Sequence, residues 1–447
     1  MRDLSSLVKA YDVRGTVPDQ LDEQVARAFG AAFVRVTGAP RIVLAHDMRD
    51  SSVPLSAAFA DGATSQGADV VDAGLGSTDL LYFASGSLDL PGAMFTASHN
   101  PARYNGIKMC RAGAKPVGQD TGLREIRALA EQDLPPVGPP GRVEERDLLP
   151  AYAAYLRGLV DLSGIRPLTV VVDAGNGMAG YTAPAVLTAP LAVVPLYFEL
   201  DGTFPNHEAN PLEPANLRDL QAKVVEVGAD LGLAFDGDAD RCFVVDERGV
   251  PVSPSAVTAL VAVRALADHP GGTIIHNLIT SRAVPEIIRE HGGVPVRTRV
   301  GHSFIKQQMA ENDAVFGGEH SAHYYFQDFW RADTGMLAAL HVLAALGTAD
   351  VPLSTLASAY ERYVASGEIN STVTDAPGRT AAVEEAYGKR DGVSVDHLDG
   401  LTVSLPDGSW FNLRPSNTEP LLRLNVEAPD EKTLAELRDA VLALVRA

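Results

Sequence analysis

Short apolar runs of strand length alternate with stretches of helical spacing along most of this chain. Such alternation is typical of α/β proteins with parallel or mixed sheets. One hydrophobic core cannot hold 447 residues, and domains average about 150 residues, so three or four domains are predicted. The predicted strands are 41–46, 169–172, 231–235 and 273–275, and the predicted helices are 53–66, 120–132, 216–228, 255–267, 333–346 and 430–446.

A weak internal repeat predicts that several of these domains are related. Similar blocks start near Asp47, Asp173 and Asn277, and each passes from an apolar strand through a polar residue to a helix start. The proline-rich segment 134–141 predicts an extended connector after the first domain, because proline blocks regular structure. The segment 366–379 predicts a crossing into a C-terminal unit that is small enough to move as a lid.

Composition argues against several classes of function. The formal net charge of −20 disfavours nucleic acid or an anionic membrane as a partner, since both require positive surface. No apolar run approaches the roughly 20 residues that cross a bilayer. Residues 1–7 lack the apolar core of a secretory signal, and only Cys110 and Cys242 are present, which does not suggest a disulfide framework. We expect a cytoplasmic protein that holds any anionic substrate with a local basic cluster.

The segment 96–101 reads Thr-Ala-Ser-His-Asn-Pro and places a serine hydroxyl at a sharp turn. The preceding residues 90–95 are predicted to form a short buried strand. Asn100-Pro101 is a turn signal, because proline biases the residue before it away from helix. Ser98 is therefore expected on a loop at a strand end, where it suits a nucleophile. A purely hydrogen-bonding turn is the alternative.

The segment 235–241 carries carboxylates at every second position directly after an apolar strand. Three adjacent carboxylates repel and raise one another's pKa, so a hard divalent cation is their natural partner, and Mg²⁺ is favoured if a phosphate adds oxygens. The residues concerned are Asp236, Asp238 and Asp240.

Two other readings of this acidic segment remain open. A calcium EF-hand matches in spacing, because Glu247 is twelfth from Asp236. Its sixth position, however, is Arg241 where glycine is needed, and the flanks 231–235 and 242–246 are predicted strands where that module needs helices. An acidic hairpin turn with Arg241 as charge partner is the second alternative.

A third polar segment, 317–323, reads Gly-Gly-Glu-His-Ser-Ala-His after a predicted strand at 314–316. A loop opened by paired glycines is predicted here, with Glu319 accepting hydrogen bonds from neighbouring sugar hydroxyls. A zinc site at His320 and His323 is an alternative, although no cysteine and no His-x-x-x-His helix lies nearby. An ordinary polar loop is another.

The fourth segment, 411–420, reads Phe-Asn-Leu-Arg-Pro-Ser-Asn-Thr-Glu-Pro and is followed by Arg423. Arginine can meet a phosphate with two parallel hydrogen bonds, and a tight turn of hydroxyl, amide and backbone donors completes such a cradle. The predicted phosphate-binding residues are Arg414, Ser416, Asn417 and Thr418. A proline-bounded turn without a ligand is the alternative.

Together, the four segments resemble the α-D-phosphohexomutase superfamily, and more closely its bacterial phosphomannomutase/phosphoglucomutase branch, in identity, order and spacing along essentially the whole chain. The resemblance implies an α/β, heart-shaped protein with three related mixed α/β domains and a smaller α+β C-terminal domain. The implied domains are 1–142 with a phosphoserine loop, 143–250 with a metal-binding loop, 251–366 with a sugar-binding loop and 367–447 with a phosphate-binding loop.

The same resemblance implies the roles of the site residues. One departure is that related enzymes often carry a lysine where this chain has Ile279, so part of the positive lining is either missing or supplied by Arg282. The implied catalytic residues are Ser98, His99, Lys108, Arg14 and Arg241; the implied metal ligands are Ser98, Asp236, Asp238 and Asp240; and the implied substrate-binding residues are Tyr11, His302, Glu319, Ser321, His323, Arg414, Ser416, Asn417, Thr418 and Arg423.

The implied function is interconversion of hexose 6-phosphate and hexose 1-phosphate, with mannose phosphates favoured. It requires Mg²⁺, a phosphoserine and a bound hexose 1,6-bisphosphate, which is both primer and intermediate. A phosphoglucomutase or dual-specificity enzyme is an alternative, whereas phosphoglucosamine mutases generally carry Gln in place of His320. A metal-dependent phosphatase has no use for a second phosphate clamp, and a non-catalytic homologue is expected to have lost Ser98 or an aspartate. A monomer or weak homodimer is expected.

Overall fold

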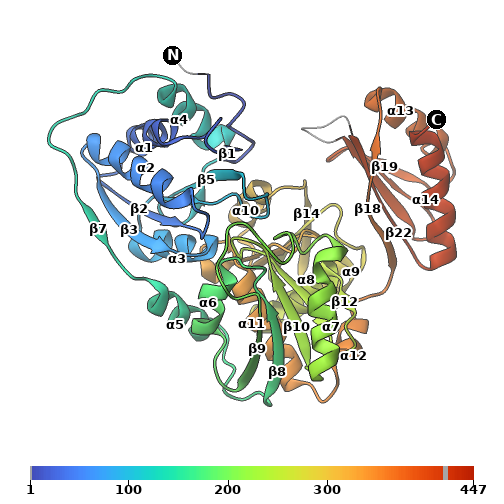
Figure 1. Cartoon of the computed structure of the whole chain (residues 1–447). Coiled ribbons are helices and arrows are strands. Elements are labelled where there is room, and N and C mark those ends of the chain that lie inside the picture. Colours follow the sequence, from blue (N-terminus) through green and yellow to red (C-terminus); the bar gives the residue numbers. More distant parts are fainter. Residues whose placement is uncertain (1–2, 416–420) are drawn as a thin grey trace.

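We describe the protein from a computed structural model, which defines the structure of residues 3–415 and 421–447. In these residues four sheets follow one another along the chain, and each has its own helices. Figure 1 shows the first domain and the fourth domain on opposite sides of the molecule, with the second and third domains between and below them. No helix in the described ranges is both long and apolar enough to cross a membrane.

The first sheet is mixed and has helices on both faces. Strands β2, β3, β4 and β7 are parallel, whereas β1 and β6 pair antiparallel with β5. The sheet order is β1 (Asp12–Thr16), β5 (Tyr104–Arg111), β4 (Gly92–Phe95), β2 (Arg41–His46), β3 (Asp69–Leu75) and β7 (Val143–Glu145), with β6 (Lys115–Pro116) beside β5. The helices are α1 (Glu23–Thr37), α2 (Ser52–Ser65), α3 (Thr78–Leu88), the 3₁₀ turn η1 (Gln119–Thr121) and α4 (Leu123–Ala130).

The second sheet repeats this arrangement, with three adjacent parallel strands, β10, β8 and β9, and two antiparallel strands beside them. Its central strand reads Leu-Thr-Val-Val-Val-Asp, and β-branched residues of this kind suit a strand covered on both faces. The order is β12 (Pro251–Val252), β11 (Cys242–Asp246), β10 (Leu231–Phe235), β8 (Leu168–Asp173) and β9 (Leu191–Leu196). The helices are α5 (Leu149–Leu159), α6 (Ala179–Val186), η2 (Pro214–Leu217) and α7 (Arg218–Val227).

The third sheet has the same pattern of parallel and antiparallel pairs as the second. The order is β14 (Val294–Thr298), β13 (Thr273–Asn277), β15 (Phe316–Gly318), β16 (Tyr324–Phe326) and β17 (Ala332–Asp333). The helices are α8 (Pro254–Asp268), α9 (Ala283–Glu290), α10 (His302–Glu311), η3 (Gln327–Phe329), α11 (Gly335–Thr348) and α12 (Leu353–Ser358). The predicted relation among the first three domains is confirmed, because β2, β8 and β13 occupy equivalent central positions.

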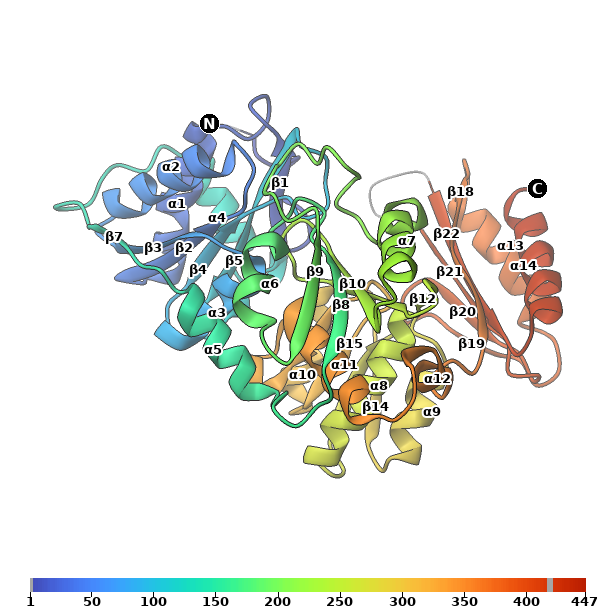
Figure 2. The same cartoon turned by 60° about the horizontal axis from the view of Figure 1, so that its bottom comes forward.

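The fourth domain is antiparallel throughout its sheet. Its order is β18 (Val364–Thr372), β22 (Leu421–Ala428), β21 (Trp410–Pro415), β20 (Leu401–Ser404) and β19 (Ser394–Asp396). Helices α13 (Ala376–Tyr387) and α14 (Glu431–Val445) cover the face of this sheet that lies away from the other domains (Figure 2). Helix α14 begins after Asp430, whose side chain accepts from the Thr433 amide, and it buries Leu434, Leu437, Val441 and Val445 at helical spacing.

The hydrophobic core separates the fourth domain from the rest. One continuous cluster contains Leu81 of the first domain, Val171 of the second and Phe316 of the third. The fourth domain has a separate cluster that includes Phe411 and Val441. The first three domains are therefore packed as one unit. The fourth domain has its own core and is joined to the others by the connecting chain and by the surfaces that face them.

Most predicted elements are confirmed, with small shifts at their ends. The predicted helix 120–132 is wrong in one respect: it is interrupted at Gly122, whose φ of +130° is a conformation that other residues rarely adopt. The predicted helix 333–346 begins later, because the Thr334 side chain accepts from the Leu337 amide and caps α11.

Two predicted domain boundaries fall at the start of the short strands β7 and β12, and the third falls inside the longer strand β18. Residues after 142 form β7, which pairs with β3 of the first sheet, and residues after 250 form β12, which pairs with β11 of the second. Strand β18 already pairs with β22 before residue 366. By their sheets, the first two domains extend past the predicted boundaries, and the fourth begins before its own. The segment 366–379 therefore contains strand and helix of the fourth domain where a crossing was predicted.

A buried carboxylate joins the first three domains. Asp79 in α3 accepts from Tyr152 Oη of the second domain at 2.7 Å and from Thr334 Oγ1 of the third at 2.6 Å, and Ser77 also donates to it. Burial raises the pKa of Asp79 to about 6, although these hydroxyl donors act in the opposite direction.

Asp79→Asn is expected to destabilise the protein less at about pH 7.5 than at about pH 5, by on the order of 1 kcal/mol. The folded pKa of about 6 lies above the unfolded value of about 3.9, so the native state binds the proton more tightly. The free energy of unfolding of the native sequence therefore falls as pH rises through this window, and asparagine removes that fall. Thermal midpoints of both proteins at both pH values measure the difference, with Asp61→Asn on the exposed surface as control. An equal gap at both pH values contradicts the prediction.

Candidate active site

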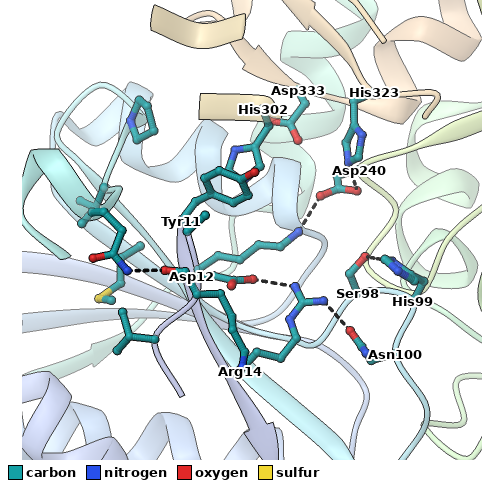
Figure 3. A pocket seen from close by; sticks show the side chains of 18 of the residues that line it. Tyr11, Asp12, Arg14, Ser98, His99, Asn100, Asp240, His302, His323 and Asp333 are labelled. Carbon is teal, nitrogen blue, oxygen red and sulfur yellow. Dashed lines mark hydrogen bonds and ion pairs between the residues drawn. The ribbon is translucent and has the colours of Figure 1, made fainter. Parts of the chain in front are cut away.

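A single cavity of about 820 Å³ is lined by residues of all four domains. Figure 3 shows side chains from widely separated segments pointing into it, among them Arg14, Ser98, Asp240 and His323. Lys108 of the first domain and Arg414 and Arg423 of the fourth also line this cavity. The structure therefore brings together one or more residues from each of the four predicted segments.

Ser98 lies on a turn after β4 and faces the aspartate segment of the second domain. Its Oγ donates to Asp236 Oδ2 at 2.8 Å and lies 3.2 Å from His99 Nδ1. The Ser98 backbone has a φ of +50°, which is unfavourable for a residue with a side chain, and its amide donates to Thr96 Oγ1 at 2.9 Å. Burial lowers the pKa of His99 well below its usual value, so this imidazole is neutral beside the hydroxyl.

The three aspartates converge on the turn between β10 and β11. One carboxylate oxygen from each of Asp236, Asp238 and Asp240 lies within 4.8 Å of the others, and all three side chains are buried. Burial raises the pKa of Asp236 to about 6, an effect opposed by Arg241 and reinforced by the other two carboxylates. The flanking elements are paired strands, so the calcium EF-hand alternative is wrong.

Cationic side chains surround this carboxylate cluster. Lys108 Nζ lies 2.6 Å from Asp238 Oδ2 and 2.6 Å from Asp240 Oδ2, and Arg241 Nε donates to Asp236 Oδ2 at 2.9 Å. Burial alone lowers the pKa of Lys108, but the two aspartates outweigh it and raise that pKa well above its usual value. Arg14, also in the cavity lining, donates to Asp12 Oδ2 at 2.6 Å and contacts the Asn100 amide oxygen.

The sugar-loop segment differs partly from its prediction. Gly317 and Gly318 belong to β15, where they pair with β16, so the loop begins at Glu319. The Glu319 carboxylate accepts from Tyr325 Oη at 2.7 Å, from Asn277 Nδ2 at 3.2 Å and from the Gly301 amide at 3.3 Å. Glu319 is buried and is not among the residues that line the 820 Å³ cavity, and these three partners fix its orientation.

His323 connects this loop to the metal-ligand candidates. Its Nδ1 lies 2.9 Å from Ser321 Oγ, and its Nε2 lies 3.5 Å from Asp240 Oδ1. Burial lowers the pKa of His323, but the hydrogen bond and charge of Asp240 outweigh this and raise it above its usual value. His320 instead lines a separate cavity between the third and fourth domains, and no group of three or more candidate metal ligands in the described residues includes it, which argues against the zinc alternative.

His302 and Tyr11 form another part of the wall. Their rings meet edge to face with centroids 4.3 Å apart, and both line the cavity. Burial lowers the pKa of His302 to about 3, so it is neutral. Gly301 precedes it with a φ of +130°, and a side chain there would meet Tyr11 Oη at 2.7 Å.

The fourth domain contributes two arginines. Arg414 Nη2 lies 3.3 Å from Glu368 Oε2, and Arg423 Nη1 lies 3.2 Å from Glu368 Oε1. Both guanidinium groups line the cavity and share this carboxylate. The other predicted members of the phosphate loop, Ser416, Asn417 and Thr418, lie outside the described residues.

The positions of Ile279 and Arg282 show whether Arg282 supplies the positive charge of the lysine that Ile279 replaces. Ile279 lines the cavity between the third and fourth domains, and Arg282 lines another cavity between the same two domains. Arg282 binds Glu286 and the Gly408 carbonyl. Arg282 therefore does not replace the missing lysine in the 820 Å³ cavity.

The sequence reasoning missed several residues that hold the site together. Asp47 and Asn277 were noted only as starts of repeated blocks. Asp47 directly follows β2 and binds Arg49, and Asn277 is the last residue of β13 and donates to Glu319. Lys306, whose Nζ lies 2.6 Å from Asp333 Oδ1, was also missed. The repeat was the available signal for Asp47 and Asn277, because carboxyl ends of parallel strands form the usual ligand edge of α/β sheets.

Comparison with known proteins agrees with this architecture. Four domain profiles of the phosphoglucomutase/phosphomannomutase family match residues 5–135, 150–249, 253–363 and 368–444, described as α/β/α domains I, II and III and the C-terminal domain. The phosphomannomutase of Escherichia coli K12 is 40% identical over 446 residues, covering 97% of both chains. A protein of Xanthomonas campestris named "phosphohexose mutases" is 42% identical over 436 residues, covering 96% of both.

A solved structure gives the same result. The phosphoglucomutase/phosphomannomutase family protein of Burkholderia thailandensis superposes with a TM-score of 0.89 at 35% identity, covering 100% of this chain and 98% of the other. Four domains around one polar cavity therefore define an enzyme of the phosphohexomutase class, an isomerase. The chain belongs to the phosphoglucomutase/phosphomannomutase family, the bacterial branch of the α-D-phosphohexomutase superfamily.

Proposed function

We propose that the protein interconverts hexose 6-phosphate and hexose 1-phosphate through a phosphoserine at Ser98 and a bound hexose 1,6-bisphosphate, with mannose phosphates as preferred substrates. The observation that carries the proposal is the position of Ser98 Oγ, 2.8 Å from Asp236, in the cavity that Arg414 and Arg423 line from the fourth domain. A nucleophile and a distant pair of cations in one cavity suit a substrate with two phosphate positions.

The proposed reaction has two halves, and each half moves one phosphoryl group between Ser98 and the sugar without releasing it to water. In the first half the Ser98 Oγ–P bond breaks and a bond forms between phosphorus and a sugar hydroxyl oxygen. The hydroxyl proton leaves to a base, and Ser98 Oγ takes up a proton as the serine is released. The bisphosphate then reverses its ends, and the second half returns the other phosphoryl group to Ser98 Oγ with the same exchange of bonds. The serine ends as it began.

The residues around Ser98 supply alignment and charge. Phosphoryl transfer depends mainly on positioning and on neutralising the equatorial oxygens, which suits Arg14, Lys108 and Arg241. Mg²⁺ fits the three aspartates, because Asp238 Oδ1 is buried and finds no hydrogen-bond partner within residues 3–415 and 421–447. Asp236, Asp238 and Asp240, together with the Ser98 side chain, would hold the ion, which would supply Lewis-acid charge neutralisation.

The proton carrier depends on the charge of the aspartates. While Lys108 bridges Asp238 and Asp240, its raised pKa keeps it protonated. When the negative charge of Asp238 and Asp240 is neutralised, the pKa of Lys108 falls. Lys108 can then exchange a proton with the sugar hydroxyl. His99 and His323 are the other carriers within reach of Ser98 and Asp240.

The remaining residues bind the sugar and the phosphate that is not reacting. Glu319 and Ser321 accept hydrogen bonds from sugar hydroxyls, and Tyr11 and His302 form the neighbouring part of the wall. Arg414 and Arg423, with Ser416, Asn417 and Thr418, hold the second phosphate. Approach of the fourth domain excludes water that would hydrolyse the phosphoserine.

Arg414→Ala is expected to raise KM for both hexose phosphate isomers by about 10- to 100-fold, because a charge-assisted hydrogen bond to phosphate is lost. The carboxylate of Glu368 also loses one of its two arginine partners and keeps Arg423. Steady-state kinetics in both directions measure the effect, with Arg438→Ala, a partly exposed position on α14, as control. An unchanged KM argues against a phosphate clamp in the fourth domain.

The test of the proposed function is a single-turnover experiment with the isotopically labelled phosphoserine enzyme. Label that passes to the hexose phosphate supports the mutase, whereas label that appears as inorganic phosphate supports the phosphatase alternative. Kinetics on mannose 1-phosphate and glucose 1-phosphate side by side then decide the sugar. The mannose preference is supported by the phosphomannomutase of E. coli at 40% identity; equal specificity constants for both sugars identify a dual-specificity enzyme.

A further inference from the structure

Arg49 lies beneath the serine turn and has no assigned role in the proposed chemistry. It follows β2 in the segment Asp47-Met48-Arg49 and is 2% exposed. Every N–H of its guanidinium group has an acceptor. Nε donates to Asp47 Oδ2 at 3.2 Å, Nη1 donates to the carbonyls of Pro101 and Tyr104 at 3.0 Å each, and Nη2 donates to the carbonyls of Ser98 at 2.8 Å and Asn100 at 2.7 Å.

These four carbonyls belong to one short turn, residues 98–104, whose conformation is otherwise unfavourable. Ser98 has a φ of +50°, a backbone conformation that costs on the order of 1 kcal/mol for a residue with a Cβ. A planar fork with five donors can satisfy carbonyls that point toward a common centre, which a lysine ammonium cannot do in the same directions. Arg49 therefore stabilises the turn in the shape that aims Ser98 Oγ at Asp236.

Arg49 is also linked, through Asn100, to the Arg14 guanidinium in the cavity. Arg49 holds the Asn100 carbonyl, while the Asn100 side-chain oxygen accepts from Arg14 Nη1. Asp47 in turn is fixed by Ser52 Oγ, which donates to its Oδ1 at 2.5 Å. One buried arginine thus orients both the serine and, through Asn100, the arginine that faces the same cavity (Figure 3).

The second domain closes over Arg49 from the other side. The Phe204 ring lies over the guanidinium with 5.1 Å from Cζ to the ring centroid, and a side chain at Gly202 would meet Arg49 Cα at 2.7 Å. Next to the aspartates, a side chain at Gly237 would meet the Ser98 carbonyl at 2.5 Å. The serine turn is therefore clamped between Arg49 and the domain that carries Asp236.

We propose that Arg49 is a positioning residue for phosphoryl transfer, which sets the distance and direction from Ser98 Oγ to the reacting phosphorus without touching substrate. The proposal rests on the proposed function, because the position of this oxygen matters only if Ser98 carries the phosphoryl group. It predicts that Arg49 affects kcat and leaves substrate binding unchanged.

Arg49→Lys is expected to lower kcat by about 10- to 100-fold, because a displacement of about 1 Å at the reacting centre can cost that much. KM for hexose phosphate is expected to change little. The rate of label transfer from phosphoserine to hexose phosphate in a single turnover is expected to fall by the same factor as kcat. This rate is measured per active site, so loss of folded protein alone would not lower it. In Arg49→Ala, added guanidinium ion is expected to restore part of kcat.

The matched control is Arg248→Lys. Arg248 also follows an aspartate at the end of a strand and donates from Nε and Nη2 to Asp246, but it is 63% exposed and lies outside the cavity. If Arg49→Lys does not fold, Phe204→Leu decides, because removing the ring cover should lower kcat at unchanged KM. Native single-turnover rates in Arg49→Lys, or in Phe204→Leu when that variant decides, overturn the inference alone. Failure of label transfer in the native enzyme overturns the proposed function.

Discussion

Ser98→Ala is expected to abolish sustained isomerisation, with a loss of at least about 10³-fold, because the nucleophile that carries the phosphoryl group is removed. Binding of hexose phosphate is expected to stay near its native value, since Ser98 Oγ contacts Asp236 and His99 and is only one part of a cavity of about 820 Å³. Coupled assays in the presence of hexose 1,6-bisphosphate measure turnover, and calorimetry measures binding.

The control is Ser87→Ala, which removes an exposed hydroxyl on α3 in the same domain. It should leave both turnover and binding unchanged. Substantial turnover in Ser98→Ala that persists with the bisphosphate would mean that another group accepts the phosphoryl. Equal loss of binding and turnover would mean that the hydroxyl shapes the cavity and does not react.

The sequence predicted the α/β domains well because the strands that form the sheet centres are strongly apolar. Strand β10 matches its prediction of 231–235, and β8 and β13 contain theirs. These strands are buried on both faces, so their composition alone identifies them. The short strands β7 and β12 were missed, because two- or three-residue edge strands have no detectable period.

The predicted site residues that the structure brings together come mainly from local runs of residues. Ser98 and the aspartates lie in such runs, and the structure brings Ser98 Oγ to 2.8 Å from Asp236 although the two are 138 positions apart. Arg49 and Tyr325 were not predicted, because they act through single side chains on distant partners. An isolated arginine or tyrosine in a sequence forms no recognisable pattern. Only the fold shows that Arg49 donates to the Ser98 carbonyl and that Tyr325 donates to Glu319.

The buried carboxylate of Asp238 favours a metal-binding role for the aspartates over charge pairing with nearby cationic side chains alone. Its Oδ2 accepts from Lys108 Nζ and from Thr78 Oγ1, both at 2.6 Å, whereas its Oδ1 has no hydrogen-bond partner in the described part of the chain. An unpaired carboxylate oxygen in a fully buried position is costly unless a cation meets it. The three carboxylates form ion pairs with Lys108 and Arg241, and His323 Nε2 lies 3.5 Å from Asp240 Oδ1.

Asp238→Asn is therefore expected to raise the Mg²⁺ concentration needed for half-maximal activity by at least about 100-fold, since a unit charge about 4 Å from another is worth about 4 kcal/mol at an effective dielectric of 20. Activity at a fixed Mg²⁺ concentration falls accordingly. Asp246→Asn, at the end of the next strand and also buried, is the matched control, because Asp246 pairs with Arg248. It should change stability more than metal dependence.

The two measurements separate two roles that one carboxylate can play. If Asp238→Asn binds Mg²⁺ as tightly as the native enzyme by calorimetry yet loses activity, Asp238 acts by fixing Lys108, and the ion sits elsewhere. If both the Mg²⁺ affinity and the activity fall, and excess Mg²⁺ restores part of the activity, the carboxylate is a ligand. Rescue by excess metal is the decisive arm, because a misplaced lysine is not corrected by mass action on a cation.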